Sequence, residues 1–180
     1  MRPLRIVTSL LITALVACGH PAAPGPIVLV DDAGDTLRLA RPAERVVSLI
    51  PAATELLFAI GAGPQVVGRT RYDDWPPEVA SVPSVGDGLY PALEAVLARR
   101  PDLVVLYRGA GTAGAAARLR SLGVPALAIR TDRLGDVPRV AELLGTATGH
   151  AAGADSVAGR FARELDSVSV PPSGHRAIGT

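Results

Sequence analysis

The sequence contains few of the residues on which several protein classes depend. Only one of its 180 residues is a cysteine, which excludes a disulfide-rich scaffold and a metal site built from several cysteines. Aromatic residues make up 3% of the chain, and lysine and asparagine are absent. The formal net charge is +1 and there is no block of basic residues, so we expect no nucleic-acid partner. Because 48% of the residues are hydrophobic and 19% are charged, the chain can fill a core and is not a disordered protein.

The first segment predicts export from the cytoplasm. Arg2 and Arg5 precede an apolar run over 6–17. This run is shorter than the about 20 residues that a membrane-spanning helix needs. A basic start followed by a short apolar stretch and small residues is typical of a signal peptide, which we place at 1–17.

The end of the apolar run predicts a lipid anchor. Residues 15–18 read Leu-Val-Ala-Cys and resemble the lipobox of bacterial lipoproteins, in which the cysteine becomes the lipidated first residue of the mature protein. Cys18, the single cysteine, stands at the position that the lipobox requires. The segment 18–26 is rich in proline and glycine and is interpreted as a tether at a membrane surface, in the periplasm or at the cell surface. An ordinary signal peptide with a chance cysteine is the alternative.

Strand-like and helix-like segments alternate along the rest of the chain. Two short segments around a turn rich in aspartate and glycine, 27–30 and 36–39, predict a hairpin. Continuous apolar runs predict strands that are buried on both faces. The predicted strands are 45–50, 65–68, 102–107 and 124–129, and the predicted helices are 54–60, 93–99, 113–122, 136–144 and 150–167. This order predicts an α/β fold, with a parallel sheet flanked by helices and ligands bound in the loops after the strands.

One glycine-rich motif allows a second interpretation. Residues 109–114 fit the pattern G-x-G-x-x-G after a predicted strand and before a helix, and Asp132 follows the next strand. This arrangement is typical of dinucleotide-binding proteins, so an exported oxidoreductase of the Rossmann type is an alternative. Export and the lack of a twin arginine argue against it. The structural interpretation is a helix start whose small residues allow close packing.

Motifs for catalysis are otherwise missing. The sequence contains no G-x-S-x-G, H-E-x-x-H or Walker pattern. Its three histidines, His20, His150 and His175, lie far apart in the sequence. We therefore expect a binding protein with no enzymatic activity, no resident cofactor and no metal site.

Several runs in fixed order resemble one family. They are 45–61 (Arg-Val-Val-Ser-Leu-Ile-Pro-Ala-Ala-Thr-Glu-Leu-Leu-Phe-Ala-Ile-Gly), 67–78 (Val-Gly-Arg-Thr-Arg-Tyr-Asp-Asp-Trp-Pro-Pro-Glu), Val-Gly-Asp at 85–87, Leu-Glu-Ala-Val at 93–96 and Arg-Pro-Asp-Leu-Val-Val at 100–105. Together they resemble the periplasmic binding proteins for cobalamin, haem and ferric siderophores that serve ABC importers. The resemblance extends from about residue 27 to residue 180.

The resemblance implies a domain organisation. Proteins of this family have two α/β lobes joined by a long rigid helix, and they hold the ligand in the cleft between the lobes. In this chain 27–149 would be the first lobe, 150–168 the interlobe helix and 169–180 the start of a second lobe. We therefore expect a truncated second lobe, so that the chain supplies only one wall of the cleft.

The resemblance also implies a ligand-binding set in the loops after the strands. Its members are Ala52, Ala53, Tyr72, Gly88, Tyr107, Arg108 and Gly109. Tyr72 and Tyr107 would lie against a flat ring, and Arg108 would suit a carboxylate or catecholate. Gly88 departs from the cobalamin-binding pattern, which has a tryptophan there. A half-buried surface tyrosine is the structural alternative for Tyr72.

One glutamate is assigned by resemblance to transport. Glu94 matches the glutamate that docks onto an arginine of the importer's membrane subunit, although a solvated helix glutamate is the alternative. The predicted function is therefore a lipid-anchored substrate-binding protein of an ABC importer. Its expected cargo is a corrinoid or an iron chelate. An exported oxidoreductase and a non-functional remnant are the other hypotheses.

Overall fold

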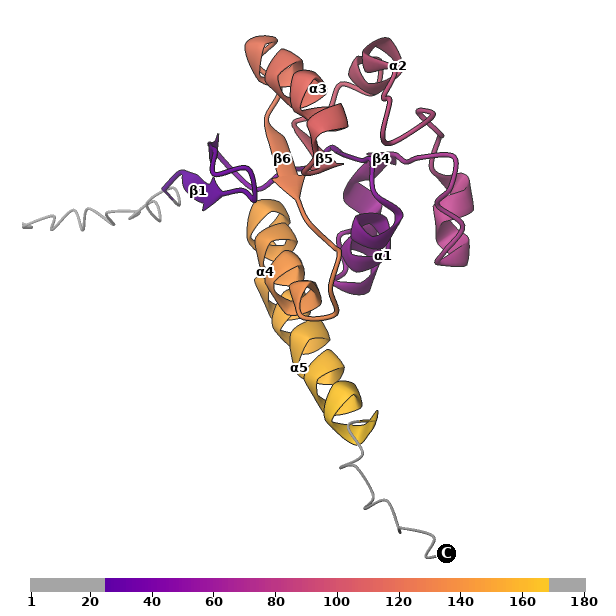
Figure 1. Cartoon of the computed structure of the whole chain (residues 1–180), viewed down its shortest axis with the longest axis vertical. Helices are drawn as coiled ribbons and strands as arrows, with labels where there is room; N and C mark the ends of the chain where they lie inside the picture. Colours follow the sequence, from indigo (N-terminus) through magenta and orange to yellow (C-terminus); the bar gives the residue numbers. More distant parts are fainter. Residues whose placement is uncertain (1–24, 169–180) are drawn as a thin grey trace, which may run out of the picture.

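The computed structural model describes residues 25–168, which form a parallel four-stranded sheet with helices on both faces and a separate hairpin (Figure 1). The sheet order is β4-β3-β5-β6, and the hairpin pairs β1 with β2. The strands are β1 (Ile27–Val30), β2 (Thr36–Leu39), β3 (Val46–Ser48), β4 (Val66–Gly68), β5 (Leu103–Tyr107) and β6 (Ala126–Ile129). The helices are α1 (Pro51–Ala59), α2 (Leu93–Leu97), α3 (Ala110–Ser121), α4 (Asp136–Thr148) and α5 (Ala151–Val168), with short 3-10 turns η1 (Gly63–Gln65) and η2 (Pro77–Ser81). The predicted α/β class is confirmed.

The strands are apolar on both sides because both faces of the sheet are covered. Successive residues of β3 point to opposite faces, so Val46 and Val47 belong to two different cores. Helices α1, α4 and the start of α5 cover the first face, whereas α2 and α3 cover the second (Figure 1). The four strands therefore read as continuous apolar runs, as parallel strands buried on both sides do.

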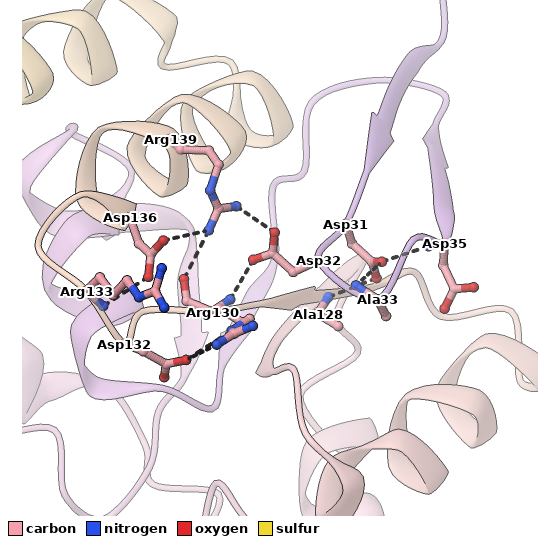
Figure 2. Close-up of polar contacts among 10 residues, drawn as sticks. All are labelled: Asp31, Asp32, Ala33, Asp35, Ala128, Arg130, Asp132, Arg133, Asp136 and Arg139. Carbon is pink, nitrogen blue, oxygen red and sulfur yellow. Dashed lines mark hydrogen bonds and ion pairs between the residues drawn. The ribbon is translucent and has the colours of Figure 1, made fainter.

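The hairpin turn covers the free edge of β6. The N–H of Asp32 donates to the carbonyl of Ala128 at 2.9 Å, and the N–H of Ala128 donates to Asp31 Oδ2 at 3.2 Å. The N–H of Arg130 donates to Asp32 Oδ2 at 2.6 Å, so both carboxylates lie along the strand (Figure 2). The side chain of Arg139 closes the cluster with an ion pair to Asp32 at 2.7 Å. These contacts satisfy an edge that would otherwise be open to pairing with another chain.

The ends of all five helices differ from the sequence-based prediction, and the differences are largest for α1, α3 and α4. Helix α1 begins at Pro51, a residue suited to the first helical position, and α3 begins at Ala110, inside the glycine-rich motif. Helix α4 passes through Gly145 to Thr148, so the predicted end of this helix at residue 144 is wrong. A Cβ on Gly145 would lie 2.6 Å from the Cβ of Ala154, which means that this glycine permits close contact between α4 and α5. The helix ends before Gly149, whose φ of 79° favours glycine.

Helix α5 returns along α4 and then extends past it, away from the sheet (Figure 1). Its apolar side chains are buried near the start of the helix, at Val157, and exposed near its end, at Leu165 and Val168. Within residues 25–168 no helix is long and apolar enough to cross a membrane. The predicted signal peptide, Cys18 with most of its tether, and the segment 169–180 lie outside the described residues.

Candidate functional site

The predicted binding residues lie on one surface of the lobe, at the ends of the parallel strands. We call this surface the carboxyl edge and define it by the segments 49–53, 69–74, 86–91, 108–110 and 130–135. The segments 49–53, 69–74, 108–110 and 130–135 follow β3, β4, β5 and β6. Because these strands are parallel, they all end at the same edge of the sheet. The segment 86–91 lies beside the loop 69–74, because the backbone N–H of Arg71 donates to the carbonyl of Gly86 at 2.9 Å. The sequence-based prediction that Tyr72 and Tyr107 share one edge of the sheet agrees with this arrangement.

Tyr72 is exposed and held in place. Its side chain is 58% exposed, and its hydroxyl donates to Asp87 Oδ2 at 3.2 Å. The Arg71 guanidinium reaches the same carboxylate at 3.4 Å and lies 5.4 Å from the centre of the Tyr72 ring. Hydrogen bonds to Asp87, led by the N–H of Leu89, lower the pKa of this carboxyl group. The ring is therefore an oriented flat surface that is open to solvent.

A buried hydrogen-bond network fixes the loop that carries Tyr72. Asp73 is 4% exposed and accepts hydrogen bonds from Thr54 at 2.5 Å and from Thr70. Thr54 Oγ1 also lies 2.8 Å from Ser48 Oγ, which connects the loop to the end of β3. The Tyr72 N–H donates to Thr70 Oγ1 at 3.1 Å. Sequence reasoning missed Asp73 because its contact with Thr54, 19 residues earlier in the chain, is made only in the folded sheet.

Tyr107 belongs to a second polar group at the end of β5. Its hydroxyl donates to Asp132 Oδ1 at 2.7 Å, and Arg130 Nε donates to Asp132 Oδ2 at 3.0 Å. The hydrogen bond between Tyr107 and Asp132 raises the pKa of the phenol and lowers the pKa of the carboxyl group. A Cβ on Gly109 would lie 3.2 Å from the Tyr107 ring, so this glycine lets the ring lie against the chain. Arg108 is exposed between them.

The lowered pKa of Asp132 gives a testable prediction. In Tyr107→Phe the hydroxyl is lost, so we expect the pKa of Asp132 to rise toward its ordinary value. A carboxyl group whose pKa is lowered by folding contributes stability above its unfolded pKa, and this contribution is lost as the pH falls through the folded pKa. The variant should therefore lose less stability in acid through this group. The carboxyl carbon shift of Asp132 followed against pH measures the pKa, and the pKa of Asp87 serves as the control that should not move.

Two members of the predicted binding set are corrected by the structure. Gly88 is buried, and a Cβ there would lie 2.1 Å from the Leu49 carbonyl oxygen, so the position has no room for a side chain. Its role is to let the 86–91 segment pack on the end of β3. Ala53 has no exposed surface because its methyl group lies in the core. Ala52 remains exposed in the first turn of α1.

Two exposed side chains beside Gly88 were missed by sequence reasoning. Tyr90 is 81% exposed and Leu89 is 57% exposed. Asp87 Oδ1 accepts hydrogen bonds from the N–H groups of both residues, at 2.8 Å for Leu89 and 3.4 Å for Tyr90. The cobalamin-binding pattern has a tryptophan at the position of Gly88. In this chain an exposed aromatic ring, that of Tyr90, lies two residues later. The signal available in the sequence was a turn-like Asp-Gly pair at 87–88 followed by two large side chains at 89–90.

The glycine-rich motif does not have the geometry of a dinucleotide site. Gly109 has an extended backbone, with φ of −162°, so none of its conformation depends on glycine. The third glycine of such a motif allows close packing of helix on strand, yet a Cβ on Gly114 would meet nothing within 4 Å. The Asp132 carboxylate is occupied by Tyr107 and Arg130. These contacts favour the structural interpretation of the motif.

Glu94 lies in the first turn of α2 and is exposed. Acidic side chains are favourable near a helix N-terminus, which accounts for a glutamate there without any partner. Its predicted docking role stays a prediction. Within residues 25–168 no group of three histidine, cysteine, aspartate or glutamate side chains is placed to hold a metal ion.

Comparisons with known proteins all point to proteins that bind a transported substrate. The family described as periplasmic binding protein matches residues 46–170. An uncharacterized ABC transporter substrate-binding lipoprotein of Bacillus subtilis is 29% identical over 168 residues, covering 86% of this chain and 53% of the relative. A vitamin B12-binding protein of Pectobacterium atrosepticum is 28% identical over 137 residues, covering 76% of this chain and 49% of the relative. The chain thus spans about half the length of the curated relatives that it matches.

Solved structures show the same fold. The periplasmic vitamin B12-binding protein of Vibrio cholerae matches with a TM-score of 0.64 and 28% identity, covering 70% of this chain and 49% of that one. A periplasmic heme-binding protein of Pseudomonas aeruginosa matches with a TM-score of 0.64 and 25% identity, covering 69% of this chain and 45% of that one.

Proposed function

Because the chain belongs to the periplasmic binding protein family, we propose that its carboxyl edge captures a corrinoid or an iron chelate for an ABC importer. The observation that carries the proposal is the oriented, exposed ring of Tyr72 on the same edge as Tyr107 and Arg108. Flat aromatic rings suit a large planar ligand, and an exposed guanidinium suits a carboxylate or catecholate at its rim. The names of relatives and structural neighbours, which bind vitamin B12 or heme, support this choice of cargo.

Several finer assignments belong to the same proposal. We place the cargo contacts at Ala52, Tyr72, Tyr107, Arg108 and Gly109 and add Tyr90 as a further aromatic contact. The lobe would extend over 27–149, and the helix 150–168 would connect it to a second lobe in the family's arrangement. The protein acts in the periplasm or at the cell surface and passes its cargo to a membrane permease. Exposed Glu94 would dock onto that permease through charge complementarity.

The cargo assignment can be tested with single substitutions. Tyr72→Ala should weaken binding of cyanocobalamin or haemin, whichever binds, by about 5- to 100-fold, the range for loss of an aromatic anchor. Titration calorimetry at high protein concentration measures the change. The control is Leu122→Ala, because Leu122 is exposed and lies at the C-terminal end of α3, whereas the N-terminal end of that helix lies at the carboxyl edge. Equal affinity of Tyr72→Ala and the unsubstituted chain would remove the main support for the site.

The lipid anchor is proposed from the lipobox at 15–18. We expect Cys18→Ala to abolish lipidation, so the variant should leave the membrane fraction or keep its uncleaved leader. Metabolic labelling with a radioactive fatty acid followed by cell fractionation reads both changes. Incorporation of label into Cys18→Ala at the level of the unsubstituted protein would show that the lipid is attached elsewhere.

A further inference from the structure

A groove separate from the carboxyl edge lies between α1 and the segment 75–83, beside the edge strand β4. Its volume is about 840 Å³, which falls within the range of small-ligand pockets. No member of the proposed cargo contacts lines it. Its lining residues are Glu55, Phe58, Ala59, Gly63, Pro64, Val66, Val67, Trp75, Pro76, Glu78, Ser81, Val82 and Pro83. The groove is therefore a candidate site in its own right.

The charged groups of the groove are all of one sign. Glu55 on α1 and Glu78 on η2 are exposed, and they are the only ionisable side chains among its lining residues. Within residues 25–168 no ion pair or hydrogen bond engages either carboxylate. The nearby Arg69 guanidinium is turned to backbone, with Nε 3.0 Å from the carbonyls of both Val79 and Val82. Two carboxylates thus line the groove, and within residues 25–168 neither is paired with an arginine.

The remaining charged neighbours lie across Trp75. Arg160 and Glu164 of α5 line an adjacent hollow of about 330 Å³, to which Glu55 and Trp75 also contribute. Because these two side chains carry opposite charges, they leave the negative character of the region unchanged. The carboxylates of the groove are therefore complementary to a positively charged ligand.

An aromatic side chain lines the groove together with the two carboxylates. Trp75 is 60% exposed, although it is a large apolar residue, and Phe58 lines the groove from α1. The face of an indole ring attracts organic cations, and valine and proline side chains supply an apolar floor. A bare divalent metal ion would need more oxygen or nitrogen donors than two carboxylates. The lining instead combines what an ammonium or guanidinium group with an apolar body requires.

We propose that this groove binds a small organic cation with an apolar body. The ammonium group lies between Glu55 and Glu78 and over the Trp75 ring, and the apolar part rests on Val66, Val67 and the prolines. The groove shares no lining residue with the proposed cargo contacts, and of these contacts Ala52 lines the adjacent hollow.

The test uses the full chain and the fluorescence of Trp75, which is the only tryptophan in the sequence. Phenethylammonium is titrated while tryptophan emission is followed, with 2-phenylethanol and phenylacetate as neutral and anionic analogues. We expect saturable binding of phenethylammonium, with both analogues at least about tenfold weaker. The double variant Glu55→Gln/Glu78→Gln should bind phenethylammonium about tenfold more weakly, whereas Glu142→Gln, an exposed change on α4, should leave its affinity unchanged.

Several results would overturn the proposal. Equal affinities for phenethylammonium and 2-phenylethanol would show that charge is not recognised. An unchanged affinity in Glu55→Gln/Glu78→Gln would show that the two carboxylates are not the recognising groups. Lack of any saturable change in Trp75 emission up to 10 mM phenethylammonium, roughly the limit of weak specific binding, would show that the groove is not a cation site.

Discussion

Replacement of Gly88 by alanine is expected to destabilise the protein by about 3 kcal/mol or more, because a side chain there collides with backbone. The added Cβ would lie 2.1 Å from the Leu49 carbonyl oxygen and 3.1 Å from Thr70 Cγ2. A backbone oxygen at the end of β3 cannot move without disturbing the sheet, so the 86–91 segment has to shift. That shift would also displace Asp87, which holds the Tyr72 hydroxyl.

Urea unfolding of the two proteins measures the effect, and Gly114→Ala is the matched control. Gly114 lies inside α3, and a Cβ there meets nothing within 4 Å. Alanine should therefore stabilise the helix at this position by about 1 kcal/mol. The two glycine-to-alanine changes are expected to have opposite signs. Equal free energies of unfolding for Gly88→Ala and the unsubstituted protein would contradict the close contact with Leu49.

The second large effect is expected for Asp31→Ala, which removes the centre of the hairpin turn. The Asp31 side chain is 1% exposed and accepts hydrogen bonds from the N–H groups of Ala33 and Asp35 at 2.9 Å each. It also accepts from Ala128 N–H and pairs with Arg120 at 2.8 Å. Loss of the carboxylate leaves these donors without their acceptor, so we expect a loss of about 3 kcal/mol in the free energy of unfolding.

A matched control separates the buried carboxylate from a surface ion pair. Asp35 pairs with the same arginine, Arg120, but its side chain is 54% exposed, so Asp35→Ala should cost less than about 1 kcal/mol. Hydrogen exchange of the Ala128 amide should accelerate in Asp31→Ala, because the hairpin no longer covers the edge of β6. Unchanged protection of that amide would show that the turn does not protect the strand.

Local patterns in the sequence were sufficient to predict most of the elements. The continuous apolar runs of β3 and β5 indicated buried strands because both faces of the sheet are covered. Alternation of strands and helices predicted that the strands of the sheet run in parallel. The glycines were harder to interpret, since Gly145 and Gly149 have the same identity but different roles. Gly149 has the left-handed conformation that ends α4. Gly145 instead lets α5 pack closely against α4. This second role depends on the packing of two helices, which a local sequence pattern does not show.

The candidate site was predictable only as a location. Loops after parallel strands share an edge, which brought Tyr72 and Tyr107 together. The groups that orient the rings were not predictable, because no local pattern marks Asp87 or Asp132 as the hydrogen-bond partner of a tyrosine. Their partners are set by the paths of the loops in space. The same holds for the hairpin turn, where the partners Asp31 and Ala128 are nearly a hundred residues apart in the chain. The resemblance also placed Gly88 among the ligand contacts, although its packing buries it.

The most direct test of the account is a map of cargo contacts on the chain by amide chemical shifts. An isotopically labelled sample is titrated with cyanocobalamin and, separately, with haemin. This measurement detects weak binding, which is expected if the cargo is held by one wall of a cleft. The account predicts that shifts for at least one cargo concentrate in the carboxyl edge, at 69–74, 86–91 and 108–110. Shifts confined to the groove beside β4, or to the opposite edge of the sheet around Leu122, would contradict it.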